Sequence, residues 1–489
     1  MDKRLTSVFL MVLLLSSLAV LGNARASDSF HGIITSSATW TKANSPYTLN
    51  GPTAIAKGVT ITVEPGVTVN LNGFYLQVNG TLIAQGTSNE NIYFTNGQVI
   101  FTTASPGGTR FEYTITDSLQ TATTLTITKN TFKSLTAGGA SIVTDNTIES
   151  LTAEVSSTVT NNQVTSSCHV GGSAKVTSNI IHARLIFDHG CTGTVSNNQI
   201  SDGIHCDIGG GDVTIKNNQI TNTNSYPLIF VAGATATISN NNIFGQNSPE
   251  SGIRIIGSYH SGIQTTVTIT DNQISNCKTG IQLSYCWAEV KRNAIYNNDV
   301  GIDINLASSF NIPLPGTTTL YIELNNIAKN QVGIQYESDQ LTATISNNNI
   351  QDNDYNFKLI GSEDVTVANN WWGTTNTEQI KQNIYDQEYD FNLGKVNTDP
   401  VLNSPDAQAP AIQNGIPTST PTPTPSQNPT NPPQNPTTIP TEVATPTLAP
   451  AQSDNQTPAN LNTIETAILI VLIIIAILIA ALILTIRRR

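Results

Sequence analysis

Histidine and charged side chains that can do chemistry are concentrated in one short stretch, between residues 169 and 207, which holds four of the chain's six histidines. Imidazole, carboxylate and guanidinium groups can hold an ion, exchange protons or hydrogen-bond to a polar ligand. What they do together depends on the backbone elements that bring them side by side. The candidate binding residues are His169, His182, Arg184, Asp188, His205 and Asp207.

An asparagine that returns every 16 to 32 residues supplies the frame for this stretch. Isoleucine or valine stands three residues before each copy, and an apolar residue stands two residues after it. These spacings are too irregular for a rigid helical array, but they suit coils that carry loops of different length. The asparagines are Asn130, Asn146, Asn162, Asn179, Asn198, Asn218, Asn241, Asn272, Asn293, Asn325, Asn348 and Asn370.

Each repeat predicts a strand followed by a corner. Val213, Thr214 and Ile215 alternate in, out and in, as a strand with one buried face requires. Asparagine tolerates left-handed backbone, so Asn218 is expected to turn the corner, and stacked corners predict an asparagine ladder. A second strand is expected to open at a recurring Gly-Ile pair. The pairs are Gly203-Ile204, Gly252-Ile253, Gly280-Ile281, Gly301-Ile302 and Gly333-Ile334.

With this repeat the chain resembles the right-handed parallel β-helix repeat proteins, which include NosD-like surface proteins and, more distantly, pectin-degrading enzymes. The resemblance covers about residues 55–402: residues 59–67 (VTITVEPGV) look like the usual first coils, and residues 369–373 (NNWWG) look like the usual last one. It implies an all-β, right-handed parallel β-helix solenoid. A β-sandwich would need hairpin signals such as Asn-Gly, and the repeat region has almost none.

Both ends of the chain predict export and anchoring. An apolar run at 8–21 precedes a small-x-small cleavage site at 24–26, and residues 467–486 are apolar and uncharged before three arginines. We expect a single-pass protein on the extracellular face of the cell membrane, with a cytoplasmic C-terminus. The expected parts are a signal peptide (1–26), capping coils (27–110), β-helix repeats (111–404) with a cap helix near 377–385, a Pro/Thr-rich linker (405–463), and a transmembrane helix with its arginine tail (464–489).

Composition limits the partners. Charged residues make up 11% of the chain, and the formal net charge is −12. Nucleic acid is not an expected partner, because binding it requires a basic face that neutralises phosphates. The linker is dominated by Pro, Thr, Asn and Gln, which cannot build a core, so it is expected to be a disordered stalk.

The repeat also places the candidate residues. Asp188 and Asp207 each follow a corner asparagine by nine positions in neighbouring coils, so their carboxylates are predicted about 5 Å apart on the outer face. That separation suits a shared cation or a retaining glycosidase pair. No cofactor is expected; calcium is the ion that such oxygen ligands would favour.

His169 and His205 are not expected to bind one metal ion together. His169 and His205 share an outward column, but they lie two coils apart with Ile186 between them, which is too far for one ion. The alternation in residues 184–188 also permits a register shifted by one residue. A solvated polar face is therefore the alternative to a functional patch.

The resemblance implies an exposed surface protein that binds glycans, mediates adhesion or builds the cell envelope, with polysaccharide or other envelope components as partners. The sequence lacks the clustered Asn-Thr-Asp, Asp-Asp and Gly-His-Gly segments of polygalacturonases. No catalytic residue is therefore assigned. A polysaccharide-degrading enzyme, either a lyase or a glycoside hydrolase, is the alternative function.

Five cysteines leave at least one without an intramolecular disulfide partner. Cys168 and Cys206 are both expected to point inward. They are predicted two coils apart, about 10 Å, which is beyond the Cα separation that a disulfide tolerates.

Overall fold

The computed structural model describes residues 29–412, except 208, 223–225, 247–249, 258–263, 306–318 and 338–341. The chain divides into two compact units, Met1–Ser419 and Thr420–Arg489, and all described residues belong to the first. The predicted signal peptide, most of the predicted linker and the predicted transmembrane helix lie outside the described residues. Within the described ranges, no helix is long and apolar enough to cross a membrane.

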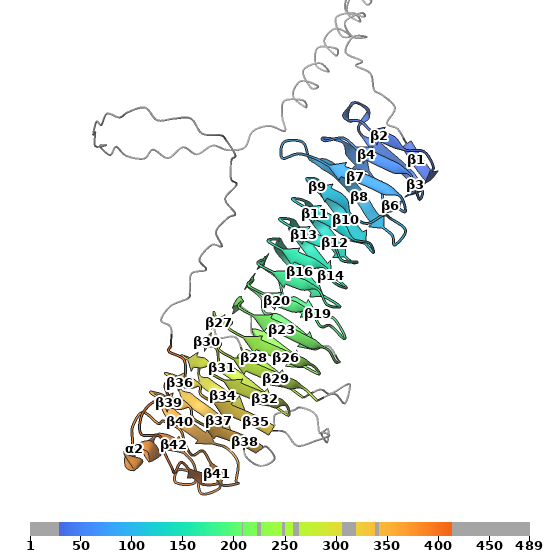
Figure 1. Ribbon diagram of the computed structural model, residues 1–489. Helices are drawn as coiled ribbons and strands as arrows, with labels where there is room; N and C mark the ends of the chain where they lie inside the picture. Colours follow the sequence, from blue (N-terminus) through green and yellow to red (C-terminus); the bar gives the residue numbers. More distant parts are fainter. Residues whose placement is uncertain are drawn as a thin grey trace, which may run out of the picture. The chain divides into compact units, whose positions relative to one another are not determined.

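The described chain winds as a solenoid of stacked coils (Figure 1), in which each strand pairs in parallel with strands of neighbouring coils. One side of the solenoid is a sheet of 15 described strands, with successive coils adding successive strands. These strands are β2 (Ala38–Trp40), β4 (Thr60–Val63), β7 (Thr81–Gln85), β9 (Thr109–Glu112), β11 (Leu125–Thr128), β13 (Ile142–Thr144), β15 (Thr158–Thr160), β17 (Lys175–Thr177), β20 (Thr194–Ser196), β23 (Asp212–Lys216), β26 (Thr235–Ser239), β29 (Thr266–Thr270), β32 (Trp287–Lys291), β35 (Thr319–Glu323) and β38 (Thr342–Ser346).

A second sheet, of 26 described strands, forms the rest of the wall. Its early strands are β1 (Ser29–Ile34), β3 (Tyr47–Ile55), β5 (Thr68–Asn70), β6 (Tyr75–Val78), β8 (Ile92–Phe101), β10 (Thr114–Thr121), β12 (Thr131–Ala137), β14 (Thr147–Ala153) and β16 (Gln163–Val170). In later coils a short strand follows the asparagine corner: β18 (Ile180–Ile181), β21 (Gln199–Ile200), β24 (Gln219–Asn222), β27 (Asn242–Gly245), β30 (Gln273–Ser275), β33 (Ala294–Tyr296), β36 (Asn326–Ala328) and β39 (Asn349–Gln351). A further strand then completes the coil: β19 (Leu185–Phe187), β22 (Ile204–Asp207), β25 (Ile229–Ala232), β28 (Ser251–Ile256), β31 (Thr279–Ser284), β34 (Val300–Ile304), β37 (Val332–Tyr336), β40 (Tyr355–Leu359) and β42 (Ile384–Tyr385).

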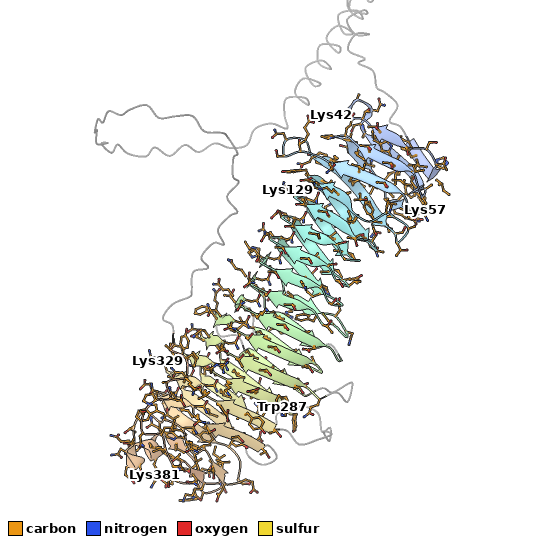
Figure 2. All side chains as sticks on the ribbon, viewed as in Figure 1. Lys42, Lys57, Lys129, Trp287, Lys329 and Lys381 are labelled. Carbon is orange, nitrogen blue, oxygen red and sulfur yellow. The ribbon has the colours of Figure 1, made fainter. Side chains whose placement is uncertain are left out.

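Apolar side chains of successive coils stack inside the walls, while polar side chains project outward (Figure 2). Val213 and Ile215 of β23 are fully buried and Thr214 is half-buried, which confirms the predicted alternation. The same inward position is filled in register along the 15-stranded sheet. That column contains Val195, Ile215, Ile238, Ile269, Val290, Ile322 and Ile345.

The predicted asparagine ladder is present and buried along its whole length. From Asn130 to Asn348, each side-chain Nδ2 donates to the Oδ1 of the next ladder asparagine at 2.9–3.0 Å. The same Oδ1 accepts the preceding asparagine's backbone N–H, as in Asn218 N to Asn241 Oδ1 at 2.9 Å. Asn218 Nδ2 also donates to the carbonyl of Val195, one coil back. Each rung therefore connects three coils.

The prediction that the ladder asparagine itself turns the corner is wrong. The left-handed residue is the one before it: Asn217 has φ 55°, and Asn218 is not among the residues with positive φ. The reversal comes one residue earlier, which leaves the asparagine side chain inside the stack, where its amide can bond. All twelve preceding residues have φ between 52° and 59°, and they are Lys129, Asp145, Asn161, Ser178, Asn197, Asn217, Asn240, Asp271, Arg292, Leu324, Asn347 and Asn369.

A second, shorter ladder, which the sequence analysis missed, lies at the next corner. Asn298 Nδ2 donates to Asn330 Oδ1, and Asn330 Nδ2 donates to Asn353 Oδ1, both at 3.0 Å. The predicted Gly-Ile pairs lie in the strands that follow this corner, β31, β34 and β37, each of which begins one residue before its glycine. Gly301 and Gly333 stand three residues after Asn298 and Asn330. At Gly280 an added Cβ would lie 2.5 Å from the carbonyl oxygen of Gly301, so only glycine allows the coils to approach.

A short helix and irregular chain lie at the C-terminal end of the stack (Figure 1). Helix α2 (Thr377–Gln382) begins after Asn376, whose side chain accepts two backbone N–H bonds as an N-cap. Ile380 and Ile384 are buried in the core. The two-stranded sheet β41 (Val365–Thr366) and β43 (Val396–Asn397) and an early 3-10 turn, η1 (Lys42–Asn44), complete the described elements.

Residues 402–412, here called the strap, run back along the outside of earlier coils. Asn349 exchanges two hydrogen bonds with the backbone of Asp406, at 2.7 and 3.1 Å. Asn326 Nδ2 donates to the Pro410 carbonyl at 3.0 Å, and Gln273 Nε2 donates to the Ala411 carbonyl at 3.3 Å. Residues 405–412, which composition assigns to the linker, are thus attached to the solenoid.

Adjacent positions on β26 test the inward and outward register. Ile238→Asp would place a charge in the fully buried column, so we expect a loss of several kcal/mol in the free energy of unfolding. Thr237→Asp would face outward between Thr214 and Thr268, and we expect a loss of at most ~1 kcal/mol from lower strand propensity. Urea unfolding of both variants measures the difference, and equal losses would contradict the register.

Leu324 tests the corner geometry. It has φ 57°, where a non-glycine residue without a short polar side chain is strained. We expect Leu324→Asn to stabilise the fold by ~1 kcal/mol. The reverse change at the equivalent corner, Asn347→Leu, should destabilise it by a similar amount. The urea midpoints of the two variants should therefore move in opposite directions.

Candidate functional site

One outward-facing column of the 26-stranded sheet crosses the predicted patch. Backbone pairing places His169, Ile186 and His205 in successive coils, which confirms that Ile186 separates the two histidines. The column then continues without a register break through the later strands. We call this set the outward column: His169, Ile186, His205, Phe230, Arg254, Gln282, Asp303, Gln335, Lys358 and Tyr385.

The predicted patch separates into local groups. His169 Nδ1 lies 3.2 Å from Asp188 Oδ1, with both side chains about two-fifths exposed. His182 Nδ1 lies 3.2 Å from the hydroxyl of Ser201. Asp207 ends β22 and its side chain is outside the described atoms, so the carboxylate pair with Asp188 stays a prediction. Nowhere in the described ranges do three or more His, Cys, Asp or Glu side chains gather as a metal site would require.

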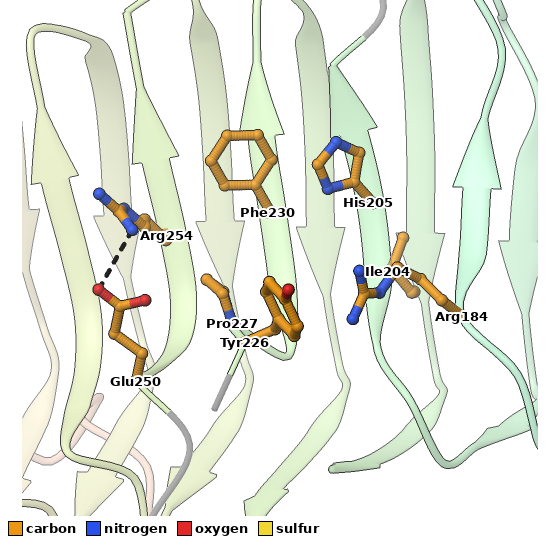
Figure 3. Close-up of a pocket in the computed structure, with 8 residues that line it drawn as sticks. All are labelled: Arg184, Ile204, His205, Tyr226, Pro227, Phe230, Glu250 and Arg254. Carbon is orange, nitrogen blue, oxygen red and sulfur yellow. Dashed lines mark hydrogen bonds and ion pairs between the residues drawn. The ribbon is translucent and has the colours of Figure 1, made fainter. Parts of the chain in front are cut away.

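The two remaining patch residues, Arg184 and His205, line a cavity of about 220 Å³ on the outer face (Figure 3). We call this cavity the aromatic groove. Its walls come from four successive coils: Arg184 directly precedes β19, and Ile204, Phe230 and Arg254 belong to β22, β25 and β28. The lining residues are Arg184, Ile204, His205, Tyr226, Pro227, Phe230, Glu250 and Arg254.

Rings form the middle of the aromatic groove. His205 stacks on Phe230, with ring centroids 4.8 Å apart and planes 21° apart. The guanidinium of Arg184 lies 4.4 Å above the centre of the Tyr226 ring, a cation–π contact. The strand register makes the first contact possible, because His205 and Phe230 are paired residues of neighbouring coils.

Charged groups lie at opposite ends of the aromatic groove (Figure 3). Arg254 Nη1 is 3.3 Å from Glu250 Oε1, and Arg184 Nη2 is 3.9 Å from Asp202 Oδ1. Arg254 Nε is buried and has no hydrogen-bond partner among the described atoms. An apolar floor with hydrogen-bonding groups at its edges matches a ligand whose faces are C–H-rich and whose rim carries hydroxyls.

Sequence reasoning found Arg184 and His205 but missed Phe230, Tyr226 and Arg254. Loops of different length separate these residues along the chain, so counting from the corner asparagine does not align them. Extending the column of His205 by strand pairing would have found Phe230, because Ile204 and Ile229 are equivalent inward residues.

The cysteines lie in the apolar interior of the β-helix. All five are buried, and no disulfide joins them within the described structure. Burial raises the pKa of the Cys168, Cys277 and Cys286 thiols to about 12, which keeps them protonated at neutral pH. No disulfide joins Cys168 to Cys206, which agrees with the prediction that the two form no bond. Nucleophilic and metal-ligating thiol chemistry requires a thiolate, so these three side chains serve as core.

Comparison with protein families finds a match to the right handed beta helix region over residues 153–317 and 203–372. These ranges contain every residue that lines the aromatic groove. Comparison with the curated proteins found no match, and comparison with the solved structures found none. The family match and the stacked coils of parallel strands agree: this chain is a right-handed parallel β-helix repeat protein.

Proposed function

We propose that this protein is a glycan-binding β-helix displayed at the cell surface. The observation that carries the proposal is the aromatic groove, which combines the Phe230 and His205 rings with two arginines and Glu250. Sugar rings present C–H groups on their faces and hydroxyls at their edges. Rings of the protein can stack on those faces, while guanidinium and carboxylate groups exchange hydrogen bonds with the hydroxyls.

Binding fits the groove better than hydrolysis does. A glycoside hydrolase needs two carboxyl groups on either side of the scissile bond. Glu250 is the only carboxylate among the described lining residues, and its Oε1 contacts Arg254. A polysaccharide-degrading enzyme remains the alternative function, and depolymerisation of a bound polysaccharide would be its signature.

Anchoring at the cell surface is the second part of the proposal. It is supported by the leader-like residues 1–26, the Pro/Thr-rich stretch before residue 463 and the apolar residues 467–486 followed by three arginines. A stalk of this composition would hold the β-helix away from the lipid. The groove would then be accessible to envelope or external polysaccharides.

The binding prediction uses the groove aromatics. Phe230→Ala removes the ring that stacks on His205, and we expect it to weaken glycan binding about five- to a hundredfold, because burial of one aromatic face contributes ~1–3 kcal/mol. A glycan array with the β-helix, followed by calorimetry on the ligands that bind, provides the measurement.

The matched control is Tyr321→Ala, which removes an exposed ring from the other, 15-stranded sheet. The Tyr321 ring lies edge-on to Trp287, which is labelled in Figure 2. Tyr321→Ala should leave binding unchanged. If the wild-type protein binds no glycan, the proposal is wrong. If Phe230→Ala and Tyr321→Ala lose the same amount of glycan affinity, the aromatic groove is not the binding site.

The topology prediction is tested on intact cells. Protease added outside should cut the stretch 413–463 and release the β-helix, because tightly paired coils resist cleavage while a proline-rich chain without a core does not. An epitope after Arg489 should stay protected until the cells are lysed. If the protease releases no β-helix until the cells are lysed, the proposed orientation is wrong.

A further inference from the structure

A second group of rings lies at the far end of the outward column. Tyr385 pairs with Lys358 across the last strand pair of that column. Tyr385 and Tyr389 stack with centroids 5.3 Å apart, and Tyr355 meets both edge-on at 5.8 and 6.2 Å. We call Tyr355, Tyr385 and Tyr389 the tyrosine cluster.

The tyrosine cluster is held in place but remains accessible. Tyr389 is 51% exposed, and its hydroxyl donates to the Gln382 carbonyl at 3.2 Å, which orients the ring. Lys358 Nζ lies 5.7 Å from the centre of the Tyr385 ring. Ile380 and Ile384 supply the buried apolar contacts at this end, so the tyrosines are not needed to fill the core.

Strand register fixes the distance between the two aromatic sites. Phe230 in the aromatic groove is six paired steps from Tyr385, which corresponds to about 29 Å at ~4.8 Å per coil. The side chains between them are all polar. They are Arg254, Gln282, Asp303, Gln335 and Lys358.

The middle of the outward column offers a ligand fewer contacts than its two ends. Asp303 is buried, and it accepts hydrogen bonds from Asn305 Nδ2 at 2.5 Å and Gln335 Nε2 at 3.0 Å. Its carboxylate is thus already satisfied by the protein. Accessible rings are available at both ends, where a ligand would gain most of its contact area.

We propose that a linear glycan lies along the outward column and is bound at both ends, by the aromatic groove and by the tyrosine cluster. The inference rests on the proposed glycan-binding function and adds a requirement for chain length. An extended sugar residue is roughly as long as one coil is thick, so a chain of several residues reaches both sites. Binding at the second site is then intramolecular and raises the overall affinity.

The experiment compares short and long oligosaccharides of the same linkage by calorimetry on the whole β-helix. The probes are cellobiose and cellohexaose, and the corresponding dimer and hexamer from chitin. For the sugar that binds, we expect the hexamer to bind at least about tenfold more tightly than the dimer. Tyr389→Ala should reduce hexamer affinity to the level of the dimer, without changing dimer affinity. Phe230→Ala should weaken both.

Two controls separate ring contact from folding. Tyr389→Phe keeps the ring and should retain the preference for the hexamer, while Tyr321→Ala removes an exposed ring from the other sheet and should change nothing. If a dimer and hexamer bind wild-type protein equally, or if Tyr389→Ala leaves hexamer affinity intact, the two-ended site is wrong but the groove stands. If none of the four probes binds, both the two-ended site and the groove proposal fail for these sugars.

Discussion

The buried asparagine ladder is the interaction on which the rest of this β-helix depends. Each rung satisfies two amide hydrogens, one acceptor oxygen and a backbone N–H inside the wall, where an unmade hydrogen bond costs ~1–3 kcal/mol. A coil that slipped by one residue would break its rung on both sides and would also exchange its inward and outward side chains. The ladder therefore selects one register, and the apolar lumen supplies the stability that the register permits.

A fixed register also decides which outward side chains become neighbours. His205 and Phe230 are 25 residues apart in the chain and stack at 4.8 Å, because their coils are aligned at the ladder. Loops between strands can change length without disturbing this alignment, since the corners and not the loops set the pairing. The residues that form a binding surface on this fold consequently come from equivalent positions of successive coils and not from one continuous stretch of the chain.

The same reasoning explains what could be predicted from sequence. The ladder and alternating strands were predictable, because the signal is local and repeats twelve times. The residue with left-handed backbone was not, because Lys129, Arg292 and Leu324 adopt it without any compositional signal. The second ladder was missed because it has only three asparagines. In the coil before Asn298 its position is occupied by Cys277, whose backbone N–H donates to Asn298 Oδ1. Of the candidate site, Arg184 and His205 were found by residue type, whereas Phe230 required pairing across loops of unequal length.

Amides outside the ladder serve a different partner. Asn349, Asn326 and Gln273 face outward just after the corners, and they bind the backbone of the strap instead of one another. Backbone recognition by amides does not depend on the strap's side chains, so a proline-rich segment that cannot donate at every position can still be held. The chain consequently leaves the described part of the β-helix beside β30, several coils before the C-terminal end. A pulling force applied at residue 412 would act on the strap before it acted on the last coil. The tyrosine cluster and helix α2 would therefore not be the first parts to bear the force.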